Sequence, residues 1–205
     1  MTPIASMPPM QVVVMCKAPV AGEVKTRLIG EGIDAERACA WHQQMAQTVI
    51  DRAALTFPSR VSIAVDDLEH PFFAPFALPL LPQGGGSLGD RLLRLAQLKI
   101  DDAPLLFLGT DSPHMTTSRL CQVAELVKSH DAVAGPVEDG GYDLIAIANR
   151  KALVLLDSID WGSSRVWTQT QQRARAAGVS LAALSTSFDV DTVADLRRSL
   201  LLGWE

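Results

Sequence analysis

Apolar runs rich in β-branched residues alternate with amphipathic helical patterns along nearly the whole chain of 205 residues. The apolar runs are continuous, which is typical of strands that are buried on both faces of a sheet. A chain in which such strands alternate with helices folds into a parallel-rich sheet with helices on both sides. The pattern therefore predicts an α/β protein.

The boundaries of the elements follow from these patterns and from the prolines and glycines between them. We expect strands over residues 10–16, 60–66, 103–111, 131–137, 142–148 and 178–191. We expect helices over residues 34–55, 87–100, 116–130, 164–177 and 192–202. The apolar, proline-rich segment 71–82 is expected to wrap the surface, either as a dimer surface or as a cover of the core.

Length and charge exclude several classes of protein. We expect one domain over residues 10–205 and a short disordered leader over residues 1–9, which lacks the basic and apolar regions of a signal peptide. No apolar run approaches the ~20 residues that span a membrane. A net charge of −5 and few aromatic residues argue against nucleic-acid binding. The three widely spaced cysteines predict reduced thiols in a cytoplasmic protein.

The loop CKAPVAGEVKTRL, residues 16–28, follows the first predicted strand. Its Lys-Thr pair resembles the end of a P-loop, but other residues stand at both glycine positions of that motif, and Gly22 is the one glycine present. Lys17, Lys25 and Arg27 remain. Cations at the start of a helix oppose the helix dipole unless an anion lies between them. We therefore interpret the segment as a phosphate-binding loop that acts through side-chain cations.

Carboxylates follow other predicted strands, at the edge where open α/β sheets bind ligands. Asp111, in FLGTDSPHM, either binds a hard cation or satisfies turn amides before the next proline. In FDVDTVADL, Asp189 and Asp191 share one face of an extended segment, roughly 6.5–7 Å apart. Thr192 and Asp195 match a helix capping box instead. The first three carboxylates together could hold one or two divalent ions, Mg²⁺ or Mn²⁺.

Two glycine-containing segments and one tryptophan add candidate contacts to a ligand. In GPVEDGGYDLIAI, Gly140 and Gly141 form either a plain hairpin turn or a place where a ligand approaches the backbone, with Asp139 or Tyr142 facing it. In PQGGGSLGDRLLRLA, a glycine-rich loop precedes a helix whose free amides could take an anion or a base edge, or else forms a flexible turn. Trp161 lies in a polar loop, as a lid, an acceptor contact or a plug of the core.

Five motifs occur in order along the chain: K-A-P-x-x-G-x-V-K-T-R-L, Q-G-G-x-S-L-G-D-R, L-G-T-D-S-P, G-P-x-x-D-G-G-Y and F-D-V-D-T-x-x-D-L. Over about residues 10–200 this order resembles the DUF2064 group of bacterial proteins, which have the glycosyltransferase-A, or nucleotide-diphospho-sugar transferase, fold. The resemblance implies a three-layer α/β/α sandwich with a mixed, mostly parallel sheet. More distantly, the chain is similar to 2-phospho-lactate guanylyltransferases and to molybdenum-cofactor nucleotidyltransferases, which bind a nucleoside triphosphate and Mg²⁺.

The resemblance also implies roles for the candidate residues. Lys25, Arg27 and Asp111 would act in catalysis. The phosphates would contact Lys17, Gly22, Lys25 and Arg27, and the base would lie against the loop that contains Gln83, Gly84, Gly89 and Arg91. The metal, Mg²⁺ or Mn²⁺, would be held by Asp111, Asp189 and Asp191. The acceptor would contact Asp139, Gly140, Gly141, Tyr142 and Trp161.

We therefore expect a metal-dependent transferase that binds a nucleotide or nucleotide-sugar and transfers a glycosyl or nucleotidyl group to a small acceptor. The chain lacks the glycine-rich first loop of the sugar-nucleotide pyrophosphorylases, and no D-x-D follows a central strand. Neither nucleotidyl nor glycosyl transfer is favoured as a result. The alternative from another class is a nucleotide-binding regulatory module without catalysis.

Overall fold

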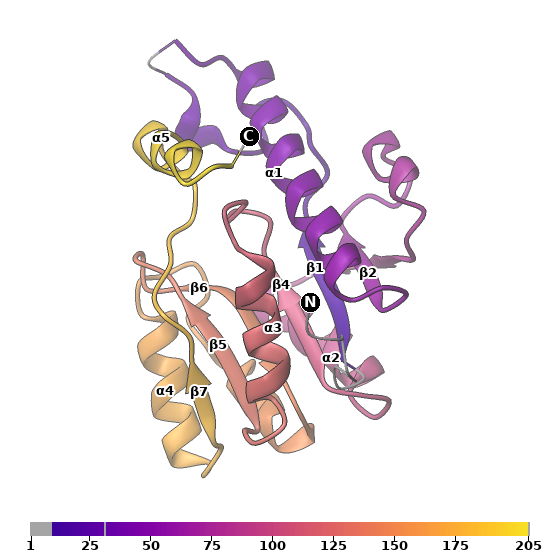
Figure 1. The fold of residues 1–205 in the computed structure, drawn as a ribbon, viewed down its shortest axis with the longest axis vertical. Coiled ribbons are helices and arrows are strands. Elements are labelled where there is room, and N and C mark those ends of the chain that lie inside the picture. Colours follow the sequence, from indigo (N-terminus) through magenta and orange to yellow (C-terminus); the bar gives the residue numbers. More distant parts are fainter. Residues whose placement is uncertain (1–9, 31, 205) are drawn as a thin grey trace.

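The computed structural model describes residues 10–30 and 32–204, and the leader expected over residues 1–9 lies outside them. Seven strands form one sheet in the order β3-β2-β1-β4-β6-β5-β7 (Figure 1). They are β1 (Gln11–Cys16), β2 (Val61–Val65), β3 (Leu80–Pro82), β4 (Leu105–Leu108), β5 (Ala132–Pro136), β6 (Tyr142–Ile147) and β7 (Leu181–Ala183). Strand β6 runs antiparallel to both of its neighbours, and the other pairings are parallel. The mixed, mostly parallel sheet is confirmed.

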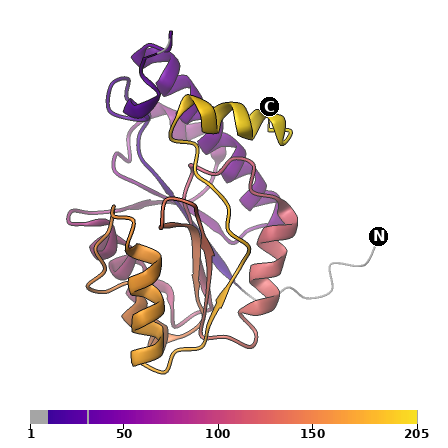
Figure 2. The ribbon, with the colours of Figure 1, turned by 90° about the vertical axis from the view of Figure 1, so that its left-hand side faces the viewer.

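Helices cover both faces of the sheet, so the three-layer prediction is also confirmed. The helices are α1 (Ala35–Thr56), α2 (Leu88–Lys99), α3 (Thr117–Leu126), α4 (Val166–Ala176) and α5 (Val193–Leu201), with short 3-10 turns at η1 (Thr26–Leu28), η2 (Pro71–Phe76) and η3 (Arg150–Leu155). Figure 2 shows α4 on one side of the sheet and α1 and α3 on the other. The 3-10 turns η1 and η3 are additions to the elements expected from the sequence.

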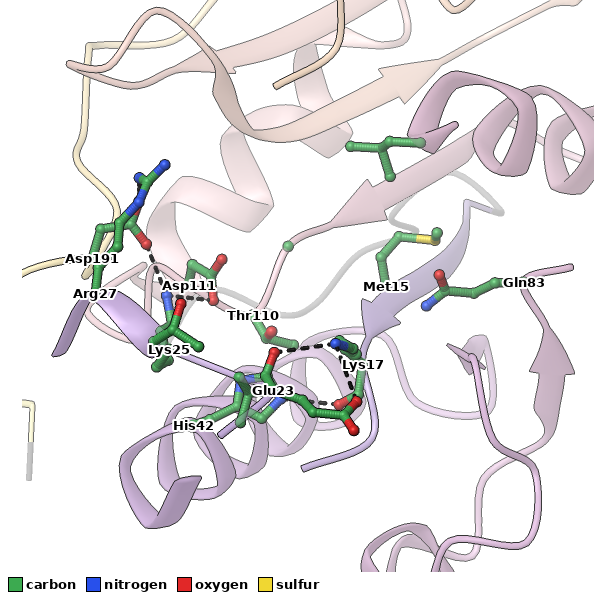
Figure 3. A pocket seen from close by; sticks show the side chains of 14 residues that line it. Met15, Lys17, Glu23, Lys25, Arg27, His42, Gln83, Thr110, Asp111 and Asp191 are labelled. Carbon is green, nitrogen blue, oxygen red and sulfur yellow. Dashed lines mark hydrogen bonds and ion pairs between the residues drawn. The ribbon is translucent and has the colours of Figure 1, made fainter. Parts of the chain in front are cut away.

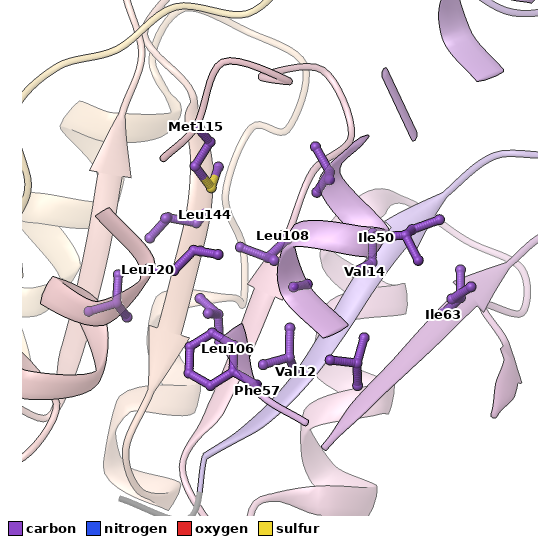
Figure 4. Packing of buried hydrophobic residues seen from close by; sticks show 14 of the residues in the cluster. Val12, Val14, Ile50, Phe57, Ile63, Leu106, Leu108, Met115, Leu120 and Leu144 are labelled. Atoms are coloured by element: carbon purple, nitrogen blue, oxygen red, sulfur yellow. The ribbon is translucent and has the colours of Figure 1, made fainter. Parts of the chain in front are cut away.

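Each face of the sheet has its own apolar core. Ile50 of α1 and Leu120 of α3 pack on Val12 and Leu106 on one face (Figure 4). Side chains of α2, η3 and α4 pack on the other face. Burying each large aliphatic side chain stabilises the fold by about 1.5–3 kcal/mol. This burial on both faces is the reason why the strands are apolar throughout.

The predicted strand over residues 178–191 is wrong for most of its length, because only β7 is paired as a strand. Beyond β7 the chain still follows β5, since the Leu184 amide donates to the Ala134 carbonyl at 2.9 Å. It then crosses to the loop after β4, where the Val190 amide donates to the Asp111 carbonyl at 2.8 Å. A segment that changes partners in this way cannot form one continuous ladder.

The segment 71–82 covers the core. Phe73 in η2 is 2% exposed, and Phe72, Phe76 and Leu80 are partly buried against the core that α1 also covers. This arrangement favours the cover over the dimer surface, and a homodimer stays a prediction, as does a single domain over residues 10–205. Within the described residues, none of the helices combines the length and the apolar character needed to cross a membrane.

Candidate active site at the carboxyl edge of the sheet

A cleft of about 500 Å³ opens beyond the carboxyl ends of β1 and β4. These strands are neighbours, but after β1 the chain continues to β2 on one side, and after β4 it continues to β5 on the other side. Ligands of open α/β sheets bind at such a change in strand order. The structure brings six of the candidate residues together in the lining of this cleft (Figure 3): Lys17, Lys25, Arg27, Gln83, Asp111 and Asp191.

Lys25 is the centre of this group. Its backbone is left-handed, with φ 48° and ψ 38°, a conformation that is strained for a residue other than glycine. Its ammonium donates to Asp111 Oδ1 at 2.8 Å, to Asp191 Oδ1 at 3.1 Å and to the Val190 carbonyl at 2.7 Å. Burial lowers the pKa of Lys25, but the two carboxylates outweigh burial and hold the pKa above its ordinary value.

The other two cations of the first loop are more accessible. Arg27 is 77% exposed and meets Asp191 Oδ2 at 3.0 Å. Lys17 is half-exposed, and its ammonium donates to the Glu23 carbonyl at 3.1 Å. Exposed ion pairs of this kind hold their partners weakly. Arg27 and Lys17 can therefore turn to an incoming anion, whereas Lys25 is already engaged by three oxygen atoms.

Asp189 differs from the other two carboxylates of the candidate metal site. It is half-buried and accepts a hydrogen bond of 2.6 Å from the Ser112 hydroxyl. Burial raises the pKa of Asp189 to about 7, with the nearby charges of Asp111 and Asp143 acting in the same direction and the Ser112 hydrogen bond opposing them. Repulsion among carboxylates is what a bound cation would relieve.

The donor set fits a hard divalent cation, although the carboxylates do not form a complete cage. Among the described residues there is no group of three or more His, Cys, Asp or Glu side chains placed to hold a metal ion. Mg²⁺ is commonly bound by one or two carboxylates together with substrate phosphates, and such a site needs no third protein ligand. Asp111 and Asp191 line the cleft, and Lys25 contacts both, but Asp111 is 44% exposed and Asp191 is also engaged by Arg27. Asp189 lies outside the lining of the cleft, next to Ser112. Asp111 and Asp189 are therefore the two carboxylates that suit this role. The metal stays a prediction.

The glycine-rich loop before α2 is fixed by polar side chains. The amide nitrogen of Gln83 donates to the carbonyls of Cys16 and Ala64, and its oxygen accepts from Arg91. Arg94 donates to the carbonyls of Gln83 and Gly85. Gln83 lines the cleft but is satisfied within the protein, so it shapes the cleft rather than offering a free group to a base. Contacts of the base with Gln83, Gly84, Gly89 and Arg91 stay predictions.

The Asp139–Tyr142 turn has a structural explanation. The Asp139 carboxylate accepts from the Gly141 amide at 2.8 Å. Gly140 has φ +91°, and a Cβ there would overlap the backbone of Ser164. The close approach at this glycine is therefore made by the protein's own chain. Tyr142 and Trp161 meet edge to face at 5.6 Å and line a second, smaller cavity beside the cleft, so an acceptor role remains a prediction for them.

Arg119 and Asp143 were not among the residues selected from the sequence. The pairing of β5 with β6 shifts between Gly135 and Pro136, and this bulge leaves Asp143 as the extra residue. Its carboxylate meets the Arg119 guanidinium at 3.2 Å in the space that Gly135 leaves open. The Asp143 carbonyl also accepts from the Gly109 amide, two residues before Asp111. A carboxylate inside an apolar strand was the signal available in the sequence.

His114 lies three residues after Asp111 and packs against the segment that carries Asp189. Its ring stacks on the Phe188 ring with 4.0 Å between the centroids, and the Arg198 guanidinium lies 3.9 Å from the centroid of the same Phe188 ring. Arg198 forms two hydrogen bonds with Glu138. Because Phe188 directly precedes Asp189, these contacts fix the segment that carries the candidate metal ligand.

Several solved structures share this fold, and the names of some of them refer to nucleotides. A candidate nucleotide-diphospho-sugar transferase from Desulfovibrio desulfuricans G20 is 28% identical over 92% of this chain and 85% of its own, with a TM-score of 0.82. CMP:2-keto-3-deoxy-manno-octonic acid synthetase, complexed with CTP, is 14% identical over 95% and 98%, with a TM-score of 0.62. Rv0371c from Mycobacterium tuberculosis, complexed with manganese, is 15% identical over 94% and 98%, with a TM-score of 0.53.

The sequence comparisons give the family. Among curated proteins, none matches this chain. Residues 49–163, more than half of the chain, match the DUF2064 family, described as an uncharacterized protein conserved in bacteria. The strand order and the resemblance to nucleotide-diphospho-sugar transferases agree with this match. The chain therefore belongs to the DUF2064 family and has the nucleotide-diphospho-sugar transferase fold.

Proposed function

We propose that the protein is a transferase that binds a nucleotide or nucleotide-sugar in the cleft and transfers a glycosyl or nucleotidyl group to a small acceptor. One observation carries the proposal: the accessible cations Lys17 and Arg27 lie beside Asp111 and Lys25 at the change in strand order. A cluster of cations next to a carboxylate suits a polyphosphate with its metal. The names of the structural relatives, which refer to sugar nucleotides and CTP, support this choice.

The residues of the cleft would have different roles in binding and catalysis. Arg27 and Lys17 would bind the phosphates and stabilise the charge that develops on the leaving group. Lys25 would hold Asp111 and Asp191 in place, because its ammonium already bonds to both carboxylates. Mg²⁺ or Mn²⁺, held by Asp111 and Asp189, would supply further neutralisation of that charge. The manganese complex of Rv0371c supports the metal as part of the proposal.

The test is a thermal-shift panel of nucleoside triphosphates and nucleotide-diphospho-sugars, each with and without Mg²⁺. A ligand at ~100 times its Kd adds about 2.7 kcal/mol to the stability of the folded state. We expect a metal-dependent rise in melting temperature with one member of the panel. A triphosphate would indicate nucleotidyl transfer, and a nucleotide-sugar would indicate glycosyl transfer. Tight binding without metal and without consumption of the donor would favour the regulatory module, and no shift with any compound would overturn the proposal.

Matched variants locate the site. Arg27→Ala should remove most of the ligand-induced shift, whereas Arg60→Ala, an exposed arginine at the start of β2, should retain it. Asp111→Asn should remove the dependence on Mg²⁺. Its control is Asp102→Asn, which changes an exposed carboxylate at the opposite end of β4. Equal shifts in Arg27→Ala and Arg60→Ala would place the ligand elsewhere.

A further inference from the structure

A second cavity of about 90 Å³ adjoins the cleft. The two share Met15, Leu88 and Gly109, so the small cavity is a side branch of the cleft rather than a separate site. Gly109 lies two residues before Asp111. The branch therefore begins close to the atoms where the transfer would take place.

The walls of this side branch are almost entirely apolar. Leu92 of α2, Phe107 of β4 and Ile145 of β6 belong to the core that α2 and α4 cover, and the Trp161 ring packs against the same core. Asp143 also borders the cavity, but its carboxylate pairs with Arg119 of α3, and α3 covers the opposite face of the sheet. No other acidic or basic residue of the described chain lines the branch.

The Trp161 indole nitrogen is buried without a hydrogen-bond partner among the described residues. This nitrogen lies against the start of α2, where a Cβ on Gly89 would overlap it. Tyr142 meets the same ring edge to face, which holds the two aromatic walls together. A hydroxyl-rich group placed here would lose its hydrogen bonds to water, and transfer of a hydroxyl without compensation costs roughly 2–7 kcal/mol.

We infer that this side branch is the acceptor subsite and that it binds a compact apolar group of the acceptor. In the acceptor, this group lies next to the phosphate, carboxylate or hydroxyl oxygen that attacks the donor. Liquid water occupies about 30 Å³ per molecule, so the branch has room for a group of about three heavy atoms, such as a propyl chain. The inference rests on the proposed function and gives its acceptor a chemical class. A sugar acceptor would not fill this branch.

A series of phosphate monoesters tests the inference on the unmodified protein with Mg²⁺. The probes are inorganic phosphate and methyl, ethyl, propyl and hexyl phosphate, with 2-hydroxyethyl phosphate as the polar counterpart of propyl phosphate. Each buried carbon contributes about 0.8 kcal/mol, so Kd should fall about threefold to fourfold per carbon up to propyl. Because the branch is then full, hexyl phosphate should bind no more tightly than propyl phosphate. 2-Hydroxyethyl phosphate should bind at least tenfold more weakly than propyl phosphate.

A matched pair of variants tests whether the gain in affinity from the alkyl chain arises in this branch. Leu92 and Leu95 are both buried in α2, but only Leu92 lines the branch. Leu92→Phe should abolish the preference for propyl over inorganic phosphate, and Leu95→Phe should retain it. Retention of the preference in Leu92→Phe would overturn the inference. If Leu92→Phe does not fold, the series on the unmodified protein decides alone.

The series also separates this inference from the proposed function. No gain from the alkyl chain, or equal binding of propyl and 2-hydroxyethyl phosphate, would overturn the apolar subsite while a metal-dependent shift with a nucleotide still supported the transferase. Absence of any nucleotide shift would remove the transferase, and the acceptor subsite with it.

Discussion

The Lys25 ammonium lies 2.8 Å from Asp111 Oδ1 and 3.1 Å from Asp191 Oδ1, so a loop near the N-terminus binds two segments from much later in the chain. The Lys25 side chain is 6% exposed. It therefore acts as an internal counter-ion for the carboxylates, whereas Arg27 on the same loop faces solvent.

This difference in burial predicts a large loss of stability on replacement of Lys25 and a small one on replacement of Arg27. Lys25→Met should lower the free energy of unfolding by about 1–3 kcal/mol, because two carboxylates and a buried carbonyl lose their donor. Arg27→Met should change it by less than about 1 kcal/mol, because an exposed ion pair contributes little. Urea unfolding of both variants at one pH checks the prediction. Equal losses would show that Lys25 is not the internal counter-ion.

The ion pair of Arg119 and Asp143 predicts a pH-dependent defect. The side chains are 11% and 1% exposed. Removal of one partner from a buried pair costs about 3–5 kcal/mol, so both Arg119→Met and Asp143→Asn should be strongly destabilised at pH 7. Burial raises the pKa of Asp143 to about 6 even though Arg119 opposes this rise. Without Arg119 this pKa should rise further.

The two variants should therefore respond differently to acid. In Arg119→Met the folded state binds a proton on Asp143 more tightly than the unfolded state, whose pKa is near 3.8, so relative stability falls as the pH rises through the folded pKa. The defect of Arg119→Met should be smaller at pH 5 than at pH 7. The defect of Asp143→Asn should be larger at pH 5 than at pH 7, because the parent loses the stability that protonation of Asp143 supplies as the pH rises through about 6, and asparagine does not titrate. Unfolding curves of each variant, compared with the parent at the same pH, provide the measurement.

The two adjacent glycines of the Asp139–Tyr142 turn should differ in tolerance. Gly140→Ala introduces a Cβ that overlaps the Ser164 backbone, at a φ of +91° that alanine adopts only with strain. We expect a loss of about 2–4 kcal/mol. In Gly141→Ala the nearest atom is Asp139 Oδ1 at 3.2 Å, and the loss should stay below about 1 kcal/mol. Similar melting temperatures of the two variants would contradict the structural role of Gly140.

His114 predicts a loss of stability in mild acid. Burial, together with the positive charges of Arg198, Arg119 and Arg52, lowers the pKa of His114 to about 4 from the ordinary 6.5. Between these values the unfolded chain binds more protons than the folded protein, so its contribution to stability is complete above pH 6.5 and declines as the pH falls to 4. His114→Gln should flatten the stability profile in this range. A profile parallel to that of the parent would remove His114 as the cause.

Much of the fold could be predicted because its determinants are local. The apolar runs of β1 and β2 and the start of α1 all carry short-range signals, and Asp34 accepts from the Arg37 amide as a helix cap should. Thr192 and Asp195 form the capping box that their spacing predicted. The end of the chain between β7 and α5 was not predictable, because its path depends on hydrogen bonds to Ala134 and Asp111, which are distant in sequence.

In the candidate site, too, the features with local signals could be predicted and those that depend on distant contacts could not. Carboxylates and cations at strand ends were recognisable, because strand ends that meet at one edge bring their residues together. The hydrogen bonds that occupy Gln83 and the bulge at Asp143 could not be recognised in the sequence, because both depend on the register between strands. Arg119 lies in an amphipathic helix, where its residue type gave no sign of a buried partner.

The contact of Lys25 with Asp191 joins residues 166 positions apart. During synthesis on a ribosome, the cationic loop would emerge 166 residues before its carboxylate partner. An incomplete chain would present lysine and arginine without the segment that holds them in place. The cleft is therefore complete only when the segment that carries Asp191 has docked against the first loop.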